Sequence, residues 1–129
     1  MTVLYADDDP DDYDILREAL KEIDPSISCH FANNGIEVLK ILKGSQQLPD
    51  YILLDLNMPL MNGKKCLSEL KANPKFKSIP VIIYSTTIHR EERYELCKLG
   101  ANSILEKPTN IPQLQSVLVE LLNLTNCSK

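Results

Sequence analysis

One unbroken apolar run that ends in an aspartate constrains the fold more than any other stretch of this chain. Residues 51–54 are Tyr-Ile-Leu-Leu, Asp55 follows them directly, and the chain then turns through Pro59 to Gly63. A short apolar run is typical of a strand buried on both faces, as in a parallel sheet. Asp55 is therefore expected at the carboxyl end of a central strand, where open α/β sheets bind their ligands. The alternative is an aspartate that only caps the strand by accepting hydrogen bonds from nearby amides.

The size and composition of the chain match one ordinary globular domain that spans residues 1–129. The net charge is −4, and no basic block suggests nucleic acid as a direct partner. No apolar run approaches the roughly 20 residues that a membrane helix needs, and the N-terminus has no signal-peptide pattern. The cysteines at 29, 66, 97 and 127 are widely spaced, which favours free thiols in a reducing cytoplasm over metal or disulfide use.

Strand-like and helix-like segments alternate along the whole chain. Apolar runs predict five strands, at residues 2–6, 27–32, 51–54, 80–85 and 102–105. Helical periodicity predicts five helices, from Pro10 to Ile23, at 36–43, at 64–73, at about 89–99, and around Leu114–Leu122. Residues 2–122 are the expected core, and residues 125–129 are expected to form a flexible tail. The alternation predicts an α/β fold, a doubly wound five-stranded parallel sheet with right-handed crossovers.

The predicted topology gathers polar residues at one edge of the sheet. Doubly wound sheets of five strands are commonly ordered 2-1-3-4-5, with a switch point between strands 1 and 3. In that order Asp7 and Asp8, which follow the first strand, share a crevice with Asp55. Ser85 and Lys107 follow the fourth and fifth strands on the same edge.

Six aspartates lie among the eight residues 7–14, and part of this acidic run has a simple structural explanation. Asp9 is a good N-cap for the helix that follows, and a proline comes next. Asp12 and the aspartates at 11 and 14 fall early in that helix, where its dipole favours acids. Asp7 and Asp8 precede the helix, so this explanation does not cover them.

Three carboxylates in one crevice repel each other, at about 3 kcal/mol per pair for a separation of about 5 Å and an effective dielectric constant near 20. Raised pKa values or a bound cation would relieve this repulsion. Oxygen ligands alone, with His30 and His89 expected away from the crevice, favour a hard cation, Mg²⁺ above all. Mg²⁺ beside Lys107 and the Ser85 hydroxyl is a suitable place for a phosphoryl group, with Asp55 as the nucleophile that accepts it.

Four motifs make the chain resemble a receiver domain of bacterial two-component signalling, in the response regulator family related to the chemotaxis regulator. They are residues 3–12 (VLYADDDPDD), residues 53–59 (LLDLNMP) with Gly63, residues 79–85 (IPVIIYS), and Gly100-Ala101 followed by Lys107-Pro108. Lys107 alone is most simply a surface lysine and Ser85 a strand-end hydroxyl, so the conjunction of motifs carries the resemblance. It covers residues 2–122 and implies a flavodoxin-like (βα)5 fold.

The resemblance also implies a role for each residue of the predicted crevice. Asp55 would be the phosphorylated aspartate, Ser85 the switch hydroxyl and Lys107 the lysine that pairs with the phosphoryl group. A cis bond between Lys107 and Pro108 would aim the ammonium into the site.

The same resemblance implies a Mg²⁺ site. Asp8 and Asp55 would bind the ion directly, and the backbone carbonyl of Asn57 would be a third ligand from the protein. Asp7 would act largely through water.

Two residues depart from the family pattern. Ile104 stands where the family often has an aromatic residue, so a switch is expected to work through backbone and loop shifts. Thr86 follows Ser85 where the family usually has a smaller residue, and its bulk is expected to slow access to Asp55. The extended link at residues 73–80 resembles that of single-domain regulators paired with phytochrome-type and other hybrid kinases.

The function expected from these residues is that of a stand-alone response regulator, because about seven residues follow the last predicted helix. A sensor or hybrid histidine kinase would phosphorylate it, and a partner protein would read its surface, as a monomer or a phosphorylation-linked dimer. The charged run 89–95 is a candidate for that surface, and a merely solvated helix face is the alternative. The protein is expected in the cytoplasm, without nucleic acid or membrane partners, and not as an enzyme.

Three alternatives remain open. A phosphorelay shuttle or a phosphate sink fits the same residues. An aspartyl-phosphate phosphatase of the haloacid-dehalogenase kind would carry two aspartates in a D-x-D motif after its first strand, whereas here Asp55-Leu-Asn57 follows the third strand and lacks the second acid. A scaffold that works without phosphorylation is the third alternative, and the complete set of Asp7, Asp8, Asp55 and Lys107 argues against it.

Overall fold

All five strands are parallel, so their carboxyl ends lie at one edge of a single sheet. The computed structural model describes residues 1–86, 88–108 and 110–127. The strands are β1 (Thr2–Ala6), β2 (Ser28–Ala32), β3 (Tyr51–Leu54), β4 (Val81–Ser85) and β5 (Ser103–Glu106). They are hydrogen-bonded in the order β2-β1-β3-β4-β5, which confirms the predicted α/β class and topology.

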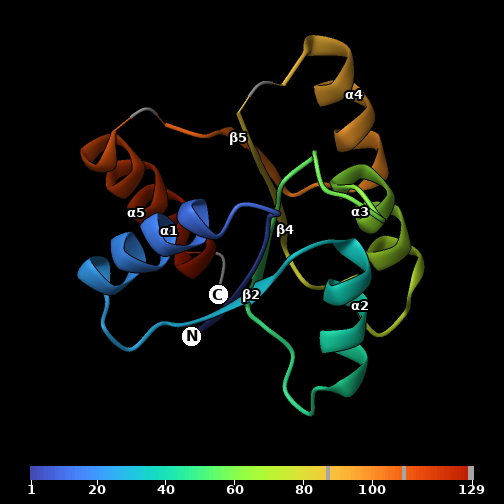
Figure 1. The fold of residues 1–129 in the computed structure, drawn as a ribbon, viewed down its shortest axis with the longest axis horizontal. Coiled ribbons are helices and arrows are strands. Elements are labelled where there is room, and N and C mark those ends of the chain that lie inside the picture. The colour runs from blue at the N-terminus through green and yellow to red at the C-terminus, as the bar shows by residue number, and fades with distance from the viewer. Residues whose placement is uncertain (87, 109, 128–129) are drawn as a thin grey trace.

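Five helices cover the two faces of the sheet. They are α1 (Pro10–Ile23), α2 (Gly35–Gly44), α3 (Gly63–Ala72), α4 (Arg90–Leu99) and α5 (Ile111–Cys127). Figure 1 shows α1 and α5 on one side of the sheet and α2, α3 and α4 on the other. Alternate strand residues face each layer, with Leu4 and Leu54 in the core under α2–α4 and Tyr5 and Leu53 in the core under α1 and α5.

Side-chain caps start three of the helices next to the carboxyl edge of the sheet. Asp9 caps α1 by accepting a hydrogen bond from the Asp11 amide at 2.9 Å. Asn34 and Asn62 cap α2 and α3 in the same way. These caps satisfy amides that have no partner within their helix, so the helix starts are set by local chemistry.

The predicted element boundaries are close to the observed ones, and two stretches differ from the prediction. The last helix continues to Cys127, beyond the predicted end near residue 122, while residues 128 and 129 lie outside the described residues. The link 73–80 is not extended. Its turns are closed by hydrogen bonds from the amides of Phe76 and Lys77 to the Asn73 carbonyl, because the apolar Phe76 side chain folds back into the core.

Within the described residues, no helix has both the length and the apolar character needed to cross a membrane.

Candidate functional site

Three carboxylates meet at the carboxyl edge of the sheet, as the predicted topology requires. Oxygen atoms of Asp7, Asp8 and Asp55 lie within 4.8 Å of one another. The backbone sets this arrangement, because the Asp55 amide donates to the Ala6 carbonyl at 3.0 Å and extends the pairing of β1 and β3. Asp7 and Asp55 are buried, whereas Asp8 is exposed.

Lys107 reaches this cluster from the far strand of the sheet. Its Nζ lies 2.6 Å from Asp7 Oδ2, 2.8 Å from Asp12 Oδ2 and 3.3 Å from Asp55 Oδ2. The Lys107 amide donates to the Ser85 carbonyl at 2.8 Å, which continues the pairing of β4 and β5. The expected cis bond to Pro108 is not found, since the described residues contain no cis peptide bond. The ammonium reaches the carboxylates without a cis bond, because the lysine side chain is long and flexible.

Ser85 and Asn57 approach the other oxygen of Asp55. The fully buried Ser85 hydroxyl donates to Asp55 Oδ1 at 2.8 Å, and the Asn57 amide donates to the same oxygen at 3.3 Å. Both oxygens of the Asp55 carboxylate therefore have hydrogen-bond donors, with Lys107 on Oδ2. A charge-assisted set of this kind orients a buried carboxylate and favours its ionised form.

Two tyrosines and one further aspartate join the site although the sequence did not single them out for it. The Tyr5 hydroxyl donates to Asp7 Oδ2, and the Tyr5 ring lies edge-on to Tyr84 with centroids 5.8 Å apart. Lys107 Nζ lies 5.8 Å from the Tyr84 ring centroid. Asp12, which the sequence explains as a helix-dipole residue, contacts Lys107. The signal for Tyr5 is its spacing from Asp7, because residues i and i+2 of a strand share a face.

The pKa values of the two buried aspartates are shifted in opposite directions. Burial, with a smaller contribution from the Asp7 charge, raises the pKa of Asp55 although the Ser85 hydroxyl and Lys107 oppose the shift. Burial acts the same way on Asp7, but hydrogen bonds from Lys107, Tyr5 and the Asp9 amide outweigh it and lower the pKa of Asp7. Asp7 is thus the more firmly ionised of the two.

The neighbouring basic and phenolic groups also respond to the site. Burial alone would lower the pKa of Lys107, but its contacts with Asp12 and Asp7 raise it above the usual range, so the ammonium stays charged. Burial raises the pKa of Tyr84 to about 12, which keeps its hydroxyl neutral.

The donor atoms at the cluster suit a hard divalent cation. All three converging groups offer carboxylate oxygens, and Mg²⁺ and Ca²⁺ prefer such oxygens. The exposed Asp8 leaves the cluster open to a cation that keeps part of its water shell. His30 lies exposed on the edge strand β2, and His89 directly precedes α4.

The two residues that depart from the family pattern have different environments. Ile104 is half-buried on β5 and packs against the core under α2–α4. Thr86 is exposed directly after β4.

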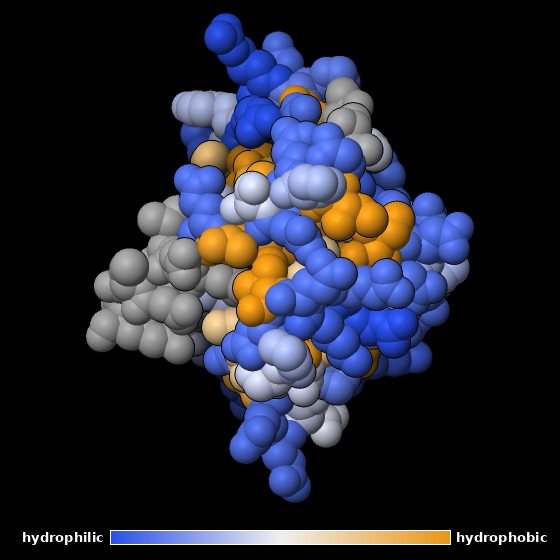
Figure 2. Space-filling model, turned by 90° about the vertical axis from the view of Figure 1, so that its left-hand side faces the viewer, coloured by the Kyte–Doolittle hydropathy of each residue, from blue (hydrophilic) through white to orange (hydrophobic). Residues whose placement is uncertain are grey.

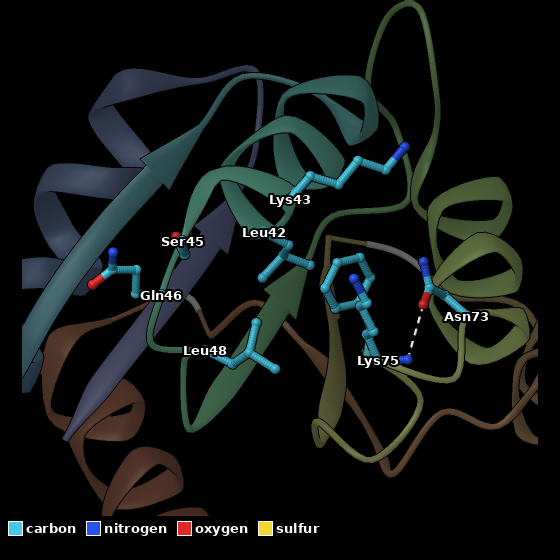
Figure 3. A pocket seen from close by; sticks show the side chains of 8 residues that line it. Leu42, Lys43, Ser45, Gln46, Leu48, Asn73 and Lys75 are labelled. Carbon is cyan, nitrogen blue, oxygen red and sulfur yellow. Dashed lines mark hydrogen bonds between the residues drawn. The ribbon is translucent and has the colours of Figure 1, made fainter.

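A separate pocket of about 620 Å³ lies away from the carboxylates. It is formed by the end of α2, the loop before β3 and the link after α3, as Figure 3 shows. Leu42, Leu48 and Phe76 provide apolar lining, and no acidic residue lines it. Carboxylate chemistry therefore belongs to the edge of the sheet and not to this pocket.

The chain belongs to the response regulator receiver domain family, whose model matches residues 3–119. Receiver domains are the phosphoacceptor switches of two-component signalling, and sensor histidine kinases phosphorylate them.

Similar proteins include both short and long members of this family. The response regulator Rcp1 of Synechocystis is 28% identical over 117 residues, which cover 87% of this chain and 80% of Rcp1. The sensor histidine kinase CheAY of Helicobacter pylori is 33% identical over 122 residues, which cover 95% of this chain. The chain spans 15% of the length of CheAY and 49% of the probable transcriptional regulator ycf29 of Pyropia yezoensis.

Solved structures of receivers have the same fold. The phosphorylated cyanobacterial phytochrome response regulator RcpA superposes with a TM-score of 0.85 at 28% identity, covering 93% of this chain and 89% of RcpA. The Mn²⁺-bound form of Rcp1 superposes with a TM-score of 0.80 at 27% identity, covering 90% and 87% of the two chains.

Proposed function

We propose that this chain accepts a phosphoryl group on Asp55 from a phosphohistidine of a sensor or hybrid histidine kinase, in the cytoplasm and with Mg²⁺. The single observation that carries this proposal is the environment of Asp55. Its buried carboxylate has the Ser85 hydroxyl on one oxygen and the Lys107 ammonium on the other. In this proposal residues 1–129 act as one receiver domain without catalytic turnover of a separate substrate.

The transfer itself requires one bond to form and one to break. A carboxylate oxygen of Asp55 forms the new P–O bond while the P–N bond of the phosphohistidine breaks, and the electron pair of that bond stays on the imidazole nitrogen. Lys107 neutralises charge on the phosphoryl oxygens, and Ser85 donates a hydrogen bond to one of them. Positioning of groups that are already in place supplies most of the rate enhancement in such a transfer.

Mg²⁺ would supply further positive charge beside the phosphoryl oxygens. In our proposal Asp8, Asp55 and the Asn57 carbonyl hold the ion, and Asp7 acts through a water. The convergence of the three carboxylates within 4.8 Å supports this assignment. The Mn²⁺-bound form of Rcp1 supports it by analogy.

An apolar surface beside the site supports a protein as the phosphoryl donor. Figure 2 looks onto the side where α1 and α5 lie and shows hydrophobic side chains among hydrophilic ones. Ile15 and Ile111 are 44% and 52% exposed, and both border a small pocket that Asp12 and Lys107 also line. Exposed apolar side chains next to a reactive group are typical of a docking surface for another protein.

The exposed face of α4 is the proposed surface through which a partner reads the signal. Tyr94 is 64% exposed there, and the Lys98 ammonium lies 4.5 Å from its ring centroid. Arg93 forms a 3.1 Å ion pair with Glu106 and so joins α4 to the end of β5, near Lys107. A change around Lys107 can therefore reach α4 through a direct contact. The partner and a phosphorylation-linked dimer both belong to this proposal.

The test is the intact mass of the protein after incubation with phosphoramidate and Mg²⁺. We expect wild type to gain one phosphoryl group, Asp55→Asn to gain none, and EDTA to abolish the gain. Asp14→Asn, which changes an exposed aspartate of α1, is the matched control and should behave as wild type. Labelling of Asp55→Asn, or no labelling of wild type by phosphoramidate, acetyl phosphate or a histidine kinase, would contradict the proposal. Steady hydrolysis of added phosphomonoesters would favour the phosphatase alternative.

A further inference from the structure

Lys107 is shared among three carboxylates, and the phosphoacceptor is the most distant of them. The Nζ atom lies 2.6 Å from Asp7, 2.8 Å from Asp12 and 3.3 Å from Asp55. An ammonium group has three N–H donors, so all three are already engaged by carboxylates. The donor that points to Asp55 can pass to a phosphoryl group there, but the two shorter contacts hold the ammonium nearer Asp7 and Asp12. A closer approach of Lys107 to the phosphoryl group therefore requires one of these two contacts to lengthen.

Asp7 is the less movable of these two partners. Its side chain is 1% exposed, the Tyr5 hydroxyl donates to Oδ2, and the Asp9 amide donates to Oδ1 at 3.0 Å. Losing the ammonium would also leave this buried carboxylate less compensated, which is costly.

Asp12 is the more movable partner. Its side chain is 33% exposed, and in the described part of the chain Lys107 is its single side-chain hydrogen-bond partner. The pair borders a pocket of about 120 Å³ between α1 and α5, which leaves room for the side chains to separate. Water can reach the partly exposed Asp12 carboxylate and replace the ammonium there more easily than at the buried Asp7.

We propose that Asp12 is a positioning residue that draws the Lys107 ammonium toward α1 in the unphosphorylated protein and competes with the phosphoryl group for it. Asp12 touches neither the phosphorus nor a reacting oxygen, so its effect on the reaction passes through Lys107. This inference rests on the proposed function, because it requires Asp55 to accept a phosphoryl group.

The test compares initial rates of phosphorylation by phosphoramidate with Mg²⁺ in four proteins. Removal of the competing charge in Asp12→Asn should raise the rate roughly two- to fivefold, the range expected for a partly exposed ion pair. Asp12→Glu keeps a carboxylate within reach of Lys107 and should stay near the wild-type rate. Asp11→Asn is the matched control, since it removes an exposed charge from the same helix turn without a contact to Lys107. Its rate should also stay near wild type.

A second measurement does not depend on phosphorylation. In a double-mutant cycle of Asp12→Asn and Lys107→Met, followed by urea unfolding in EDTA, we expect a coupling of roughly two- to fivefold in the unfolding constant. An unchanged or slower rate in Asp12→Asn, an equal gain in Asp11→Asn, or no coupling would overturn the inference.

Failure of the proposed function would look different. Wild type would then take up no phosphoryl group, or Asp55→Asn would take it up as well, while the coupling between Asp12 and Lys107 persisted. The inference about competition would fall with the proposed function in that case.

Discussion

Asp55 lies in a buried environment that both disfavours and stabilises its negative charge. Burial and the Asp7 carboxylate raise its pKa, while hydrogen bonds from Ser85, Lys107 and the Asn57 amide partly compensate. The net shift means that ionised Asp55 lowers the stability of the folded protein. In the proposed function Asp55 needs this ionised form as the phosphoacceptor, so part of the folding free energy is lost to keep the carboxylate reactive.

Asp55→Asn should therefore stabilise the metal-free protein near pH 7. We expect a gain on the order of 1 kcal/mol, because hydrogen bonds from Ser85 and Lys107 offset much of the cost of burial and of the Asp7 charge. Because the folded pKa of Asp55 lies above the unfolded one, its ionisation destabilises the fold only at higher pH. As pH falls through the folded pKa and below the usual aspartate value of about 4, Asp55 protonates in both states and the gain should vanish.

Urea unfolding of both proteins in EDTA, at about pH 7 and about pH 3, measures this difference. Asp7 contributes to the pH dependence with the opposite sign, because its lowered pKa adds stability that is lost in acid. Both proteins contain Asp7, so this contribution cancels in the difference between them. A gain that is independent of pH, or a loss of stability at neutral pH, would contradict the assigned shift.

The sequence could predict which residues lie at the site, but not the contacts that depend on tertiary geometry. The placement of Asp7, Asp8, Asp55 and Ser85 at one edge follows from strand order alone, and the structure has them there. The contact of Asp12 with Lys107 depends on the angle at which α1 leaves the sheet, which no local pattern encodes. The residue roles themselves remain predictions.

At the scale of elements, the loop between β3 and α3 lies close against the site at Gly63. The Gly63 amide donates to the Leu56 carbonyl at 3.1 Å, and a Cβ on Gly63 would lie 2.2 Å from the Asp55 carbonyl oxygen. In the same loop Leu60 has a φ of 65°, a left-handed conformation that costs a non-glycine residue about 1–2 kcal/mol. Glycine at 63 thus lets the start of α3 lie against the backbone of Asp55.

Gly63→Ala should destabilise the protein and displace Asp55. The new methyl group meets backbone rather than a movable side chain, so we expect a cost of about 1–3 kcal/mol, or more if the loop cannot yield. Urea unfolding gives the cost, and phosphoramidate labelling should slow because Asp55 moves relative to Lys107. Gly44→Ala, with open space around its Cβ at the end of α2, is the matched control and should not destabilise. Equal stability of the two variants would contradict this packing argument.

The order and type of the elements were predictable because strand runs and helical periodicity alternate without a break. The observed bounds of the predicted strands and of α2, α3 and α4 differ by no more than one residue from the predicted ones. The link 73–80 was not predictable, because Phe76 was not assigned to the core. The Lys71 ammonium also holds this link by donating to the carbonyls of Lys77 and Ile79, both at 3.1 Å.

At the scale of the whole molecule, the contacts of Lys107 with the carboxylates connect strands that are not neighbours in the sheet. The lysine follows β5, and its partners Asp55 and Asp7 follow β3 and β1, with Ser85 of β4 between them. The described cluster sets four carboxylates against this one ammonium when Asp12 is included. Excess negative charge at the edge of the sheet is a cost to the entire fold that a cation can relieve.

Mg²⁺ should therefore stabilise the whole protein against unfolding. A ligand that binds only the folded state at about ten times its Kd adds about 1.4 kcal/mol, which raises Tm by roughly 5 °C in a domain of this size. Asp8→Asn should lose most of this rise in Tm. Because the Asp8 side chain is exposed, the substitution should not disturb folding. Asp14→Asn, an exposed aspartate of α1, should keep the full rise. Thermal unfolding of the three proteins with EDTA and with Mg²⁺ measures the effect. Equal rises in all three would place the cation elsewhere on the surface, because Asp8 would then not be among its ligands.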